Sequence, residues 1–351
     1  MKAKKRSIIA LISSGQKMIS RILIVGHGSI GKRHLRLARE RFADAQIMVL
    51  RHNHSDICPK YSDGILKNED EAIAFKPQIA VVANPSNFHI KIAQTLAEAG
   101  VDLIIEKPLS STLTGVAELI HTVESNGLTL MVGYNLRFTR SLQFFKDKID
   151  KKIIGNVLSV RCEMGNFLPS WRPGSDYRKG VSANKSLGGG ALLELSHELD
   201  FLSWIFGDID WVKANLTRQS NLDVDVEDTV HLILGFMPKG SGSKLVGAVN
   251  LDFIRHDSTR LCTAIGEEGS LQWNGLTQQV MMYNPGKEGW IELAKFSMDR
   301  DDSYRLEWDN FLNCLGGSEL PMVSGKDGLN VLRIINAAQK SANSGAIEFV
   351  R

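Results

Sequence analysis

The feature that most constrains the fold of this chain is a glycine-rich loop between a short apolar run and an amphipathic run. The loop reads Gly26-His27-Gly28-Ser29-Ile30-Gly31, with apolar residues 22–25 before it and residues 32–41 after it. In a strand–loop–helix unit the first glycine permits the turn, the second lets a pyrophosphate approach the backbone, and the third lets helix and strand pack closely. The loop therefore predicts a dinucleotide site at Gly26, Gly28, Ser29, Ile30 and Gly31.

Short apolar runs and stretches with helical periodicity alternate from residue 21 to residue 133. The apolar runs lie at 22–25, 47–50, 79–83, 103–105 and 128–132. Such alternation is typical of β-α-β crossovers and predicts a doubly wound parallel sheet with helices on both faces. We therefore expect an NAD(P)-binding Rossmann domain over residues 20–134.

The second part of the chain, residues 135–351, has a different pattern. Longer runs with two-residue alternation occupy 157–164, 229–236, 244–253 and 259–265. They predict an α/β domain with a large, mostly antiparallel open sheet. Helices are expected over 191–206, directly after Gly188-Gly189-Gly190, and near 304–315 and 325–341. A substrate would be expected to bind between the two domains.

The composition excludes several kinds of partner. The net charge is only +3, and 42 basic and 39 acidic residues are interspersed. No nucleic-acid partner is expected, because phosphate backbones require a concentrated basic face. Cys58, Cys162, Cys262 and Cys314 are scattered without metal-ligand spacing. This pattern predicts a reducing compartment, the cytoplasm, and no bound metal.

The N-terminus resembles the start of a secretory signal, with basic residues before the apolar run 8–12. That run is too short for a signal core of about 7–15 apolar residues, and no run approaches the ~18 residues of a membrane span. We expect residues 1–19 to be a disordered leader and no membrane association. Met18 is an alternative initiator.

Arg51 follows the predicted second strand, where NAD enzymes place a carboxylate for the ribose hydroxyls. A guanidinium there suits a 2′-phosphate and favours NADP(H) over NAD(H); the alternative is a solvated surface arginine.

After the third strand, Pro85 stops the strand and Ser86 or Asn87 can cap the next helix. Asn84 and His89 remain as candidate cofactor contacts.

Lys107 lies in Glu106-Lys107-Pro108, directly after the apolar run 103–105. Ligands of open parallel sheets bind beyond the carboxyl ends of the strands, so this lysine should border whatever the glycine loop binds. We expect Lys107 to donate a hydrogen bond to a carbinol oxygen and share in its proton transfer, with Glu106 orienting it beside the cofactor. The alternative is a surface lysine at a strand end.

Glu194, His197 and Asp200 are spaced three residues apart and would share one face of the helix expected over 191–206. Histidine is a suitable general base, and the carboxylate of Glu194 would fix its tautomer. The alternative is a satisfied core histidine. The three glycines before this helix indicate close approach to a ligand.

Candidate substrate contacts lie in two further segments. Trp171, Arg172, Tyr177 and Arg178 precede the predicted helix, and aromatic faces and guanidinium groups suit sugar rings, hydroxyls, carboxylates and phosphates. An exposed loop pinned by Trp171 is the alternative. Tyr134 and Arg137, after the last strand of the first domain, also border the expected pocket.

These motifs, in this order, resemble those of the Gfo/Idh/MocA oxidoreductases, which include glucose-fructose oxidoreductase and inositol dehydrogenases. The resemblance covers almost the whole chain after Ser20. It implies that Lys107 and His197 match the family's catalytic lysine and histidine, and that the open sheet mediates a homodimer or homotetramer. Members commonly have Asp four residues before the histidine, where this chain has Leu193.

The resemblance implies hydride transfer between NAD(P) and a secondary hydroxyl or ketone of a sugar, cyclitol or nucleotide sugar. Two alternatives stay open. One is an NAD-dependent glycosidase or lyase that oxidises its substrate transiently, and the other is a non-enzymatic regulator that senses cofactor and sugar. Net NAD(P)H formation distinguishes the first, and the presence of Lys107 and His197 argues against the second.

Overall fold

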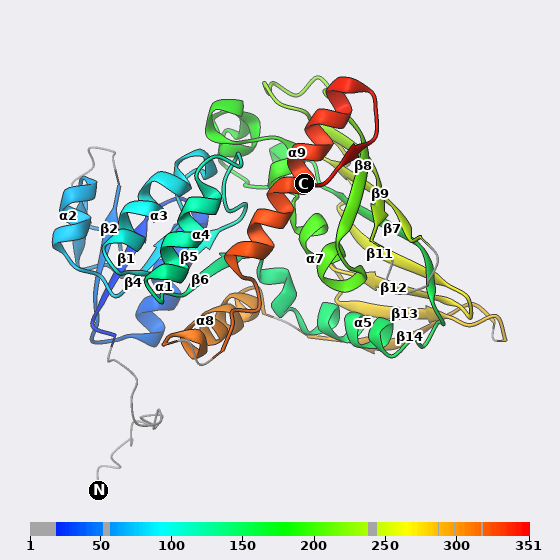
Figure 1. Cartoon of the computed structure of the whole chain (residues 1–351), viewed down its shortest axis with the longest axis horizontal. Helices are drawn as coiled ribbons and strands as arrows, with labels where there is room; N and C mark the ends of the chain where they lie inside the picture. The colour runs from blue at the N-terminus through cyan, green and yellow to red at the C-terminus, as the bar shows by residue number, and fades with distance from the viewer. Residues whose placement is uncertain (1–18, 52–56, 238–243, 287, 298, 317–318) are drawn as a thin grey trace, which may run out of the picture.

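The computed structural model describes residues 19–51, 57–237, 244–286, 288–297, 299–316 and 319–351. Two α/β halves lie side by side, and helices from the end of the chain lie between and beneath them (Figure 1). Residues 1–18 of the predicted leader, and the residues His52, Asn53 and His54 after Arg51, fall outside the described residues. Within the described parts, no helix is long and apolar enough to cross a membrane.

The first half is built on a parallel sheet with the strand order β3-β2-β1-β4-β5-β6. Its strands are β1 (Arg21–Val25), β2 (Gln46–Leu50), β3 (Gly64–Leu66), β4 (Ile79–Val82), β5 (Asp102–Glu106) and β6 (Leu130–Gly133). The residues of β4 are fully buried, as expected for strands covered on both faces. The order 3-2-1-4-5-6 confirms the predicted Rossmann sheet.

Helices join these strands. They are α1 (Ser29–Arg41), α2 (Glu69–Ala74), α3 (His89–Glu98) and α4 (Val116–Ser125), with a 3₁₀ turn η1 (Ser86–Phe88) before α3. Helices α3 and α4 pack against each other, while α1 packs on β1 and β4. The first turn of α1 follows directly from β1 and the glycine loop, which places the loop at the carboxyl ends of the strands.

The second half carries a nine-stranded sheet of described residues in the order β14-β13-β12-β11-β7-β10-β9-β8-β15. Its strands are β7 (Val157–Gly165), β8 (Ile209–Thr217), β9 (Thr229–Phe236), β10 (Val246–Asp252), β11 (Thr259–Gly266), β12 (Ser270–Asn274), β13 (Gln279–Tyr283), β14 (Trp290–Lys295) and β15 (Glu348–Phe349). Only β7 and β10 pair in parallel within this sheet. The prediction of a mostly antiparallel sheet is therefore confirmed.

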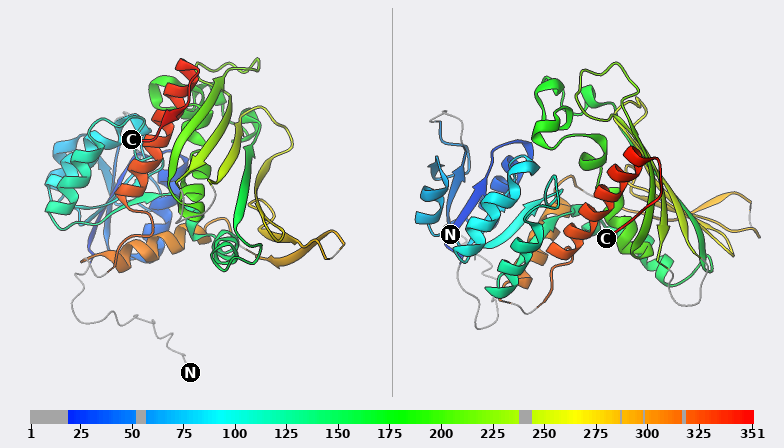
Figure 2. Two further views of the ribbon diagram at one scale, coloured as in Figure 1. Left: turned by 45° about the vertical axis from the view of Figure 1, so that its right-hand side comes forward. Right: turned by 45° about the horizontal axis from the view of Figure 1, so that its top comes forward.

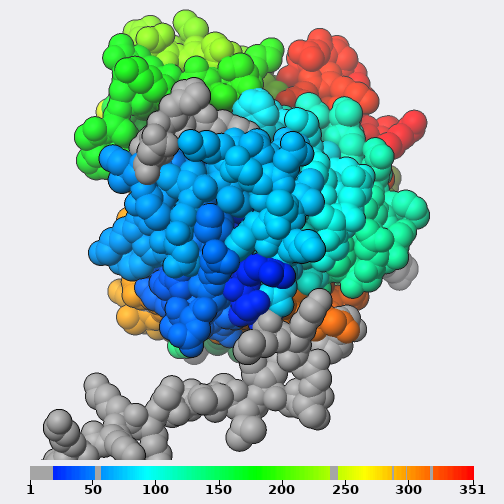
Figure 3. Space-filling model, turned by 90° about the vertical axis from the view of Figure 1, so that its left-hand side faces the viewer, coloured from blue at the N-terminus to red at the C-terminus, as the bar shows by residue number. Residues whose placement is uncertain are grey.

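The helices of this half lie on the side of the sheet that faces the Rossmann half, so the opposite face has no described helix over it (Figures 1 and 2). They are α5 (Arg140–Asp150), α6 (Ala191–Glu194), α7 (His197–Phe206), α8 (Asp302–Cys314) and α9 (Gly325–Ser344). Short 3₁₀ turns are η2 (Asn135–Phe138), η3 (Leu168–Ser170), η4 (Tyr177–Lys179), η5 (Val181–Ala183) and η6 (Lys185–Leu187). Viewed from the Rossmann side, that half fills the view, and parts of the second half stand above its upper edge (Figure 3).

The end of the chain returns to the Rossmann half. The amide of Val132 in β6 donates to the carbonyl of Val323 at 3.0 Å, and Met131 forms an antiparallel bridge with Ser324. Helix α9 then starts with a capping box between Ser324 and Asp327 and runs across to β8. The edge strand of the first sheet is thus paired with a segment from the far end of the sequence.

The single helix predicted over 191–206 is wrong, because the structure breaks it at Leu195 into α6 and α7. In a continuous helix the carbonyl of Glu194 would accept the amide of Glu198. Here that carbonyl accepts the ammonium of Lys107 at 2.8 Å, and the Glu198 amide turns to Leu195 instead. A tertiary contact therefore replaces a helical one, and Glu194 and His197 lie on separate helices.

Candidate active site

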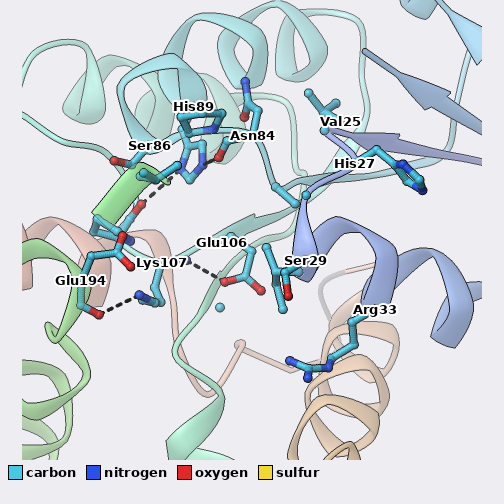
Figure 4. Close-up of a pocket in the computed structure, with 18 of the residues that line it drawn as sticks. Val25, His27, Ser29, Arg33, Asn84, Ser86, His89, Glu106, Lys107 and Glu194 are labelled. Carbon is cyan, nitrogen blue, oxygen red and sulfur yellow. Dashed lines mark hydrogen bonds between the residues drawn. The ribbon is translucent and has the colours of Figure 1, made fainter. Parts of the chain in front are cut away.

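A cavity of about 620 Å³ opens at the carboxyl ends of the Rossmann strands, between the glycine loop and the break between α6 and α7 (Figure 4). Its volume is within the range of about 300–1,000 Å³ typical of small-molecule sites. The candidate residues from the sequence that line it are Gly26, Gly28, Ser29, Ile30, Arg51, Asn84, Glu106, Lys107, His89, Arg172, Glu194 and His197.

The glycine loop leaves space only where an anion is needed. A Cβ on Gly26 would lie 2.8 Å from the Ala83 carbonyl oxygen, and one on Gly31 would lie 2.3 Å from the Gly26 carbonyl oxygen. A Cβ on Gly28 would meet nothing within 4 Å. Gly28 is also the N-cap of α1, whose first turn has neither an acidic residue nor a side-chain cap. The open backbone and free helix terminus fit the pyrophosphate of a dinucleotide, while Gly31 serves packing.

A basic residue, Arg51, directly follows β2. Arg51 lines the cavity and donates from its guanidinium to the Ile57 carbonyl at 2.6 Å. Burial, then the charges of Lys32 and Arg51, lower the pKa of His27. His27 is the second residue of the glycine loop and lines the cavity, although the sequence analysis did not select it.

Asn84 and His89 connect the loop after β4 to the loop after β5. The His89 ring lies between two carbonyl oxygens, with Nε2 2.7 Å from that of Asn84 and Nδ1 3.1 Å from that of Pro108. Burial lowers the pKa of His89, so the ring is neutral at neutral pH and donates to one of them at a time. The side-chain oxygen of Asn84 is buried at the cavity and has no hydrogen-bond partner among the described residues.

Glu106 is held by groups behind the cavity. Its Oε1 lies 2.8 Å from His34 Nε2, and the Trp308 indole donates to His34 Nδ1 at 3.1 Å. Because an indole N–H can only donate, His34 Nδ1 must accept, and the ring proton on Nε2 is donated to Glu106. The other oxygen of Glu106 accepts the amide of Lys107 at 3.2 Å. Glu106 therefore orients Lys107 through the backbone.

Lys107 reaches from the end of β5 to the break between α6 and α7. The peptide bond to Pro108 is cis, and the ammonium donates to the Glu194 carbonyl (Figure 4). The Glu194 carboxylate accepts the Ser182 hydroxyl at 3.0 Å. The predicted pairing of this carboxylate with His197 is thus absent from the described contacts, and Glu194 acts on Lys107 through its main chain.

His197 lines the same cavity as Lys107. The Tyr134 ring packs edge-on against its imidazole at a centroid distance of 5.5 Å. Burial, then the charges of Lys107 and Arg260, lower the pKa of His197 well below its usual value, so the ring is neutral at neutral pH. Its Nδ1 is buried and has no hydrogen-bond partner among the described residues. Leu193 occupies the position at which a carboxylate was expected from the resemblance.

Tyr134 and Arg137, predicted as substrate contacts, are buried and do not line the cavity. The Tyr134 hydroxyl donates to Ser196 at 3.2 Å. The Arg137 guanidinium forms two hydrogen bonds with Asp200, at 2.7 and 3.0 Å, and contacts Asp327 at 3.2 Å. Burial raises the pKa of Asp200 to about 6, which leaves it ionised at neutral pH. Tyr134 and Arg137 therefore position α7. This role could not be predicted from the sequence, because their partners are distant along the chain.

The predicted segment from Trp171 to Arg178 divides in the structure. Arg172 lines the cavity, whereas Arg178 forms an ion pair with Asp176 and does not. The Trp171 indole donates to the Asn166 carbonyl at 2.9 Å, and the Tyr177 hydroxyl accepts the Asp223 amide at 3.2 Å. The two aromatic residues therefore fix this segment against the second half.

Arg33 and Tyr304 are among the further lining residues that lie outside the predicted set. Arg33, one turn into α1, lies over the Tyr304 ring at 4.6 Å and pairs with Asp301 at 3.0 Å. Arg33 could have been found from its position after the glycine loop. Tyr304 comes from α8, and no local pattern links it to the loop. Among the described residues, no group of three His, Cys, Asp or Glu could hold a metal ion.

Comparison with known proteins gives this geometry a family. Residues 20–134 match the family profile described as oxidoreductase family, NAD-binding Rossmann fold, and residues 146–349 match its C-terminal alpha/beta domain. The chain belongs to the Gfo/Idh/MocA oxidoreductase family. The first half is the NAD-binding domain of this oxidoreductase, and the second is the family's α/β domain.

Several relatives are dehydrogenases. An inositol 2-dehydrogenase/D-chiro-inositol 3-dehydrogenase from Shouchella clausii (strain KSM-K16) is 26% identical over 305 residues, covering 84% of each chain. The structure of levoglucosan dehydrogenase in complex with NADH superposes with a TM-score of 0.82 at 22% identity, covering 95% of this chain and 99% of that one. WlbA dehydrogenase from Bordetella pertussis, in complex with NADH and UDP-GlcNAcA, gives 0.77 at 22% identity with the same coverages. The two superpositions show a shared fold.

Proposed function

We propose that this oxidoreductase transfers a hydride between NAD(P) and a secondary hydroxyl or ketone of a sugar, cyclitol or nucleotide sugar. The observation that carries the proposal is one cavity that places a lysine ammonium and a neutral histidine opposite an open glycine loop. The relatives named above, which include an inositol dehydrogenase and a levoglucosan dehydrogenase, support this class of substrate.

A nicotinamide cofactor held at the glycine loop would supply the acceptor for the hydride that leaves the carbinol carbon of the substrate. His197 accepts the hydroxyl proton as the carbon–oxygen bond becomes a carbonyl, which requires a neutral imidazole. Lys107 uses one N–H for the Glu194 carbonyl and keeps its other two donors for the substrate oxygen. Its positive charge stabilises the negative charge that develops on this oxygen during oxidation. Reduction reverses these roles.

Stoichiometry tests this function. The purified protein should form one NAD(P)H for each sugar or cyclitol oxidised, measured by absorbance and product analysis. Cleavage of a glycoside without net NAD(P)H formation would contradict the proposal and favour the transient-oxidation alternative. Cofactor and sugar binding without turnover of either would favour a regulator.

We further propose that NADP(H) is preferred over NAD(H). Arg51 replaces the carboxylate at the end of β2, and a second cavity of about 510 Å³ shares Arg33 with the first. Basic side chains of the second cavity are Lys32, Arg33, Arg36, Lys60 and Arg300, and its acidic side chain, Asp301, pairs with Arg33 and Arg36. Opposing this, the matched domain is described as NAD-binding and the superposed dehydrogenases hold NADH. A 2′-phosphate would be attracted by the positive charge, whereas a 2′-hydroxyl would gain little from it.

Fluorescence titration with NADPH and NADH tests the preference. NADPH should bind at least tenfold more tightly, and Arg51→Asp should weaken NADPH binding far more than NADH binding. Tighter NADH binding by the unmodified protein would contradict the proposed preference for NADP(H).

A cytoplasmic location, predicted from the scattered cysteines, remains a separate prediction that cell fractionation would check.

We also propose that the uncovered face of the nine-stranded sheet is the subunit interface of a homodimer or homotetramer. Ile233 and Val246 project from this face, with 47% and 38% of their surfaces exposed. Exposed apolar side chains grouped on one uncovered sheet face are typical of a subunit interface.

A further inference from the structure

A separate cavity of about 330 Å³ adjoins the active-site cavity and is formed by residues 168–182. We call it the side cavity. Arg172 lines both cavities. Ser182 lines the side cavity and Glu194 lines the active-site cavity, and the side chains of these two residues are hydrogen-bonded at 3.0 Å. A substrate whose reacting carbon lies beside Lys107 and His197 could therefore extend past Arg172 into the side cavity.

The charge of the side cavity is positive. Arg172 and Lys179 are exposed, and neither side chain has an ion pair or hydrogen bond among the described residues. Asp176 also lines the cavity, but Arg178 binds both of its carboxylate oxygens, at 2.8 and 3.0 Å. Hydrogen bonding to Arg178 lowers the pKa of Asp176, so this pair is internally neutral. Two cations thus remain available to a ligand.

The walls of the side cavity are fixed by contacts to the rest of the protein. Trp171 packs edge-on against buried Phe253 at a centroid distance of 5.2 Å, and its indole N–H is bound to Asn166. Tyr177 is held by the Asp223 amide. These contacts orient two aromatic side chains beside two free cations before a ligand arrives, which reduces the entropy lost on binding.

We propose that the substrate carries an anionic group, a phosphate or a carboxylate, and that the side cavity binds this group through Arg172 and Lys179. The inference rests on the proposed function, because it places the reacting carbon at Lys107 and His197. It makes Arg172 and Lys179 specificity-determining residues, and it excludes Arg178 from substrate contact. Neutral cyclitols and free neutral sugars would then be poor substrates.

Isothermal titration of the protein saturated with NADPH tests the proposal, since saturation fills both the pyrophosphate site and the proposed 2′-phosphate site of the cofactor. The probes are inorganic pyrophosphate, D-glucuronate and, as the neutral control, D-glucose. At least one anion should bind more tightly than D-glucose, and which anion binds distinguishes a phosphate from a carboxylate. The double variant Arg172→Ala/Lys179→Ala should weaken that binding at least tenfold, because it removes two charge-assisted contacts.

The matched control is Asp176→Asn/Arg178→Ala, which removes the internally neutral pair from the same segment and leaves Arg172 and Lys179 in place. It should bind the anion as the unmodified protein does. Equal anion binding by the double variant, equal losses in the double variant and the control, or no anion binding by the unmodified protein would each overturn the proposal. NADH affinity and turnover of neutral cyclitols are measured in parallel. If the unmodified protein binds NADH and oxidises a neutral cyclitol but does not bind the anions, the proposed function stands and only the side-cavity assignment fails.

Discussion

The ammonium of Lys107 occupies a hydrogen-bonding position that a continuous helix would give to the amide of Glu198. This contact explains which site residues could be predicted. Lys107 and His197 were found because each follows a readable local signal, a strand end or a triple glycine. The direction of the Glu194 carboxylate could not be found, because it depends on a helix break that a distant lysine stabilises.

Replacing Lys107 with Met should lower kcat by a factor of about 10²–10⁴, because it removes the donor to the substrate oxygen while keeping the length of the side chain. NAD(P)H binding, measured by fluorescence titration, should remain. Lys326→Met, at an exposed lysine paired with Glu124, is the control and should leave kcat unchanged. If the variant instead loses both its folded structure and its cofactor binding, the role of Lys107 is purely structural.

The lowered pKa of His197 predicts how the activity depends on pH. The base must be unprotonated, so kcat/KM for oxidation should fall only when the pH drops through the lowered pKa, below the usual histidine value of about 6.5. The same shift means that stability is fully present above about pH 6.5 and is lost as the pH falls toward the folded-state pKa. A pH–rate profile with its acid limb centred at or above 6.5 would argue against His197 as the base.

At the scale of elements, helix α7, which carries His197, is positioned by a buried ion pair from the segment after β6. Arg137 binds Asp200 on α7 and Asp327 on α9, so one guanidinium fixes two helices relative to the Rossmann sheet. Five of the parallel strands and the strands β7, β9, β10 and β11 were predictable, because buried parallel strands and alternating antiparallel strands leave clear patterns. The helix over 191–206 was wrongly predicted as continuous. The role of Arg137 was not predictable, because a buried guanidinium and a substrate-binding one look alike in sequence.

Replacing Arg137 with Ala should destabilise the fold by about 3–5 kcal/mol, since it leaves the Asp200 carboxylate buried without its partner. Urea unfolding monitored by circular dichroism would measure the change. Arg137→Lys should recover only part of the loss, because an ammonium cannot form the two parallel hydrogen bonds. Arg178→Ala, at an exposed ion pair, should leave the urea midpoint unchanged. An equally stable Arg137→Ala variant would refute this positioning role.

At the scale of the whole molecule, the helices of the second half gather on the side of its sheet that faces the Rossmann half (Figure 2). Both sheets were predictable from the sequence. The return of α8 and Val323 to the Rossmann half was not, because contacts between the two ends of a chain leave no periodic signal. Residues that follow the predicted boundary at residue 134 in the sequence therefore pack against the Rossmann half in space.

The open sheet face provides a test of assembly. Ile233→Glu places a charge among exposed apolar side chains and should shift the protein toward monomer in size-exclusion chromatography with light scattering. Ile347→Glu, at an exposed isoleucine outside the strands of the sheet, is the matched control and should assemble normally. A monomeric unmodified protein would contradict the proposed interface.

The pairing of Val132 with Val323 has a consequence for how the chain is made. A nascent chain leaves the ribosome with its N-terminus first, so the Rossmann strands emerge long before the segment that pairs with β6. Until then an apolar strand edge stays open to other nascent chains, and such edges promote aggregation. Biosynthesis of this oxidoreductase should accordingly depend on chaperones that shield the unfinished sheet until Val323 and Ser324 have left the ribosome.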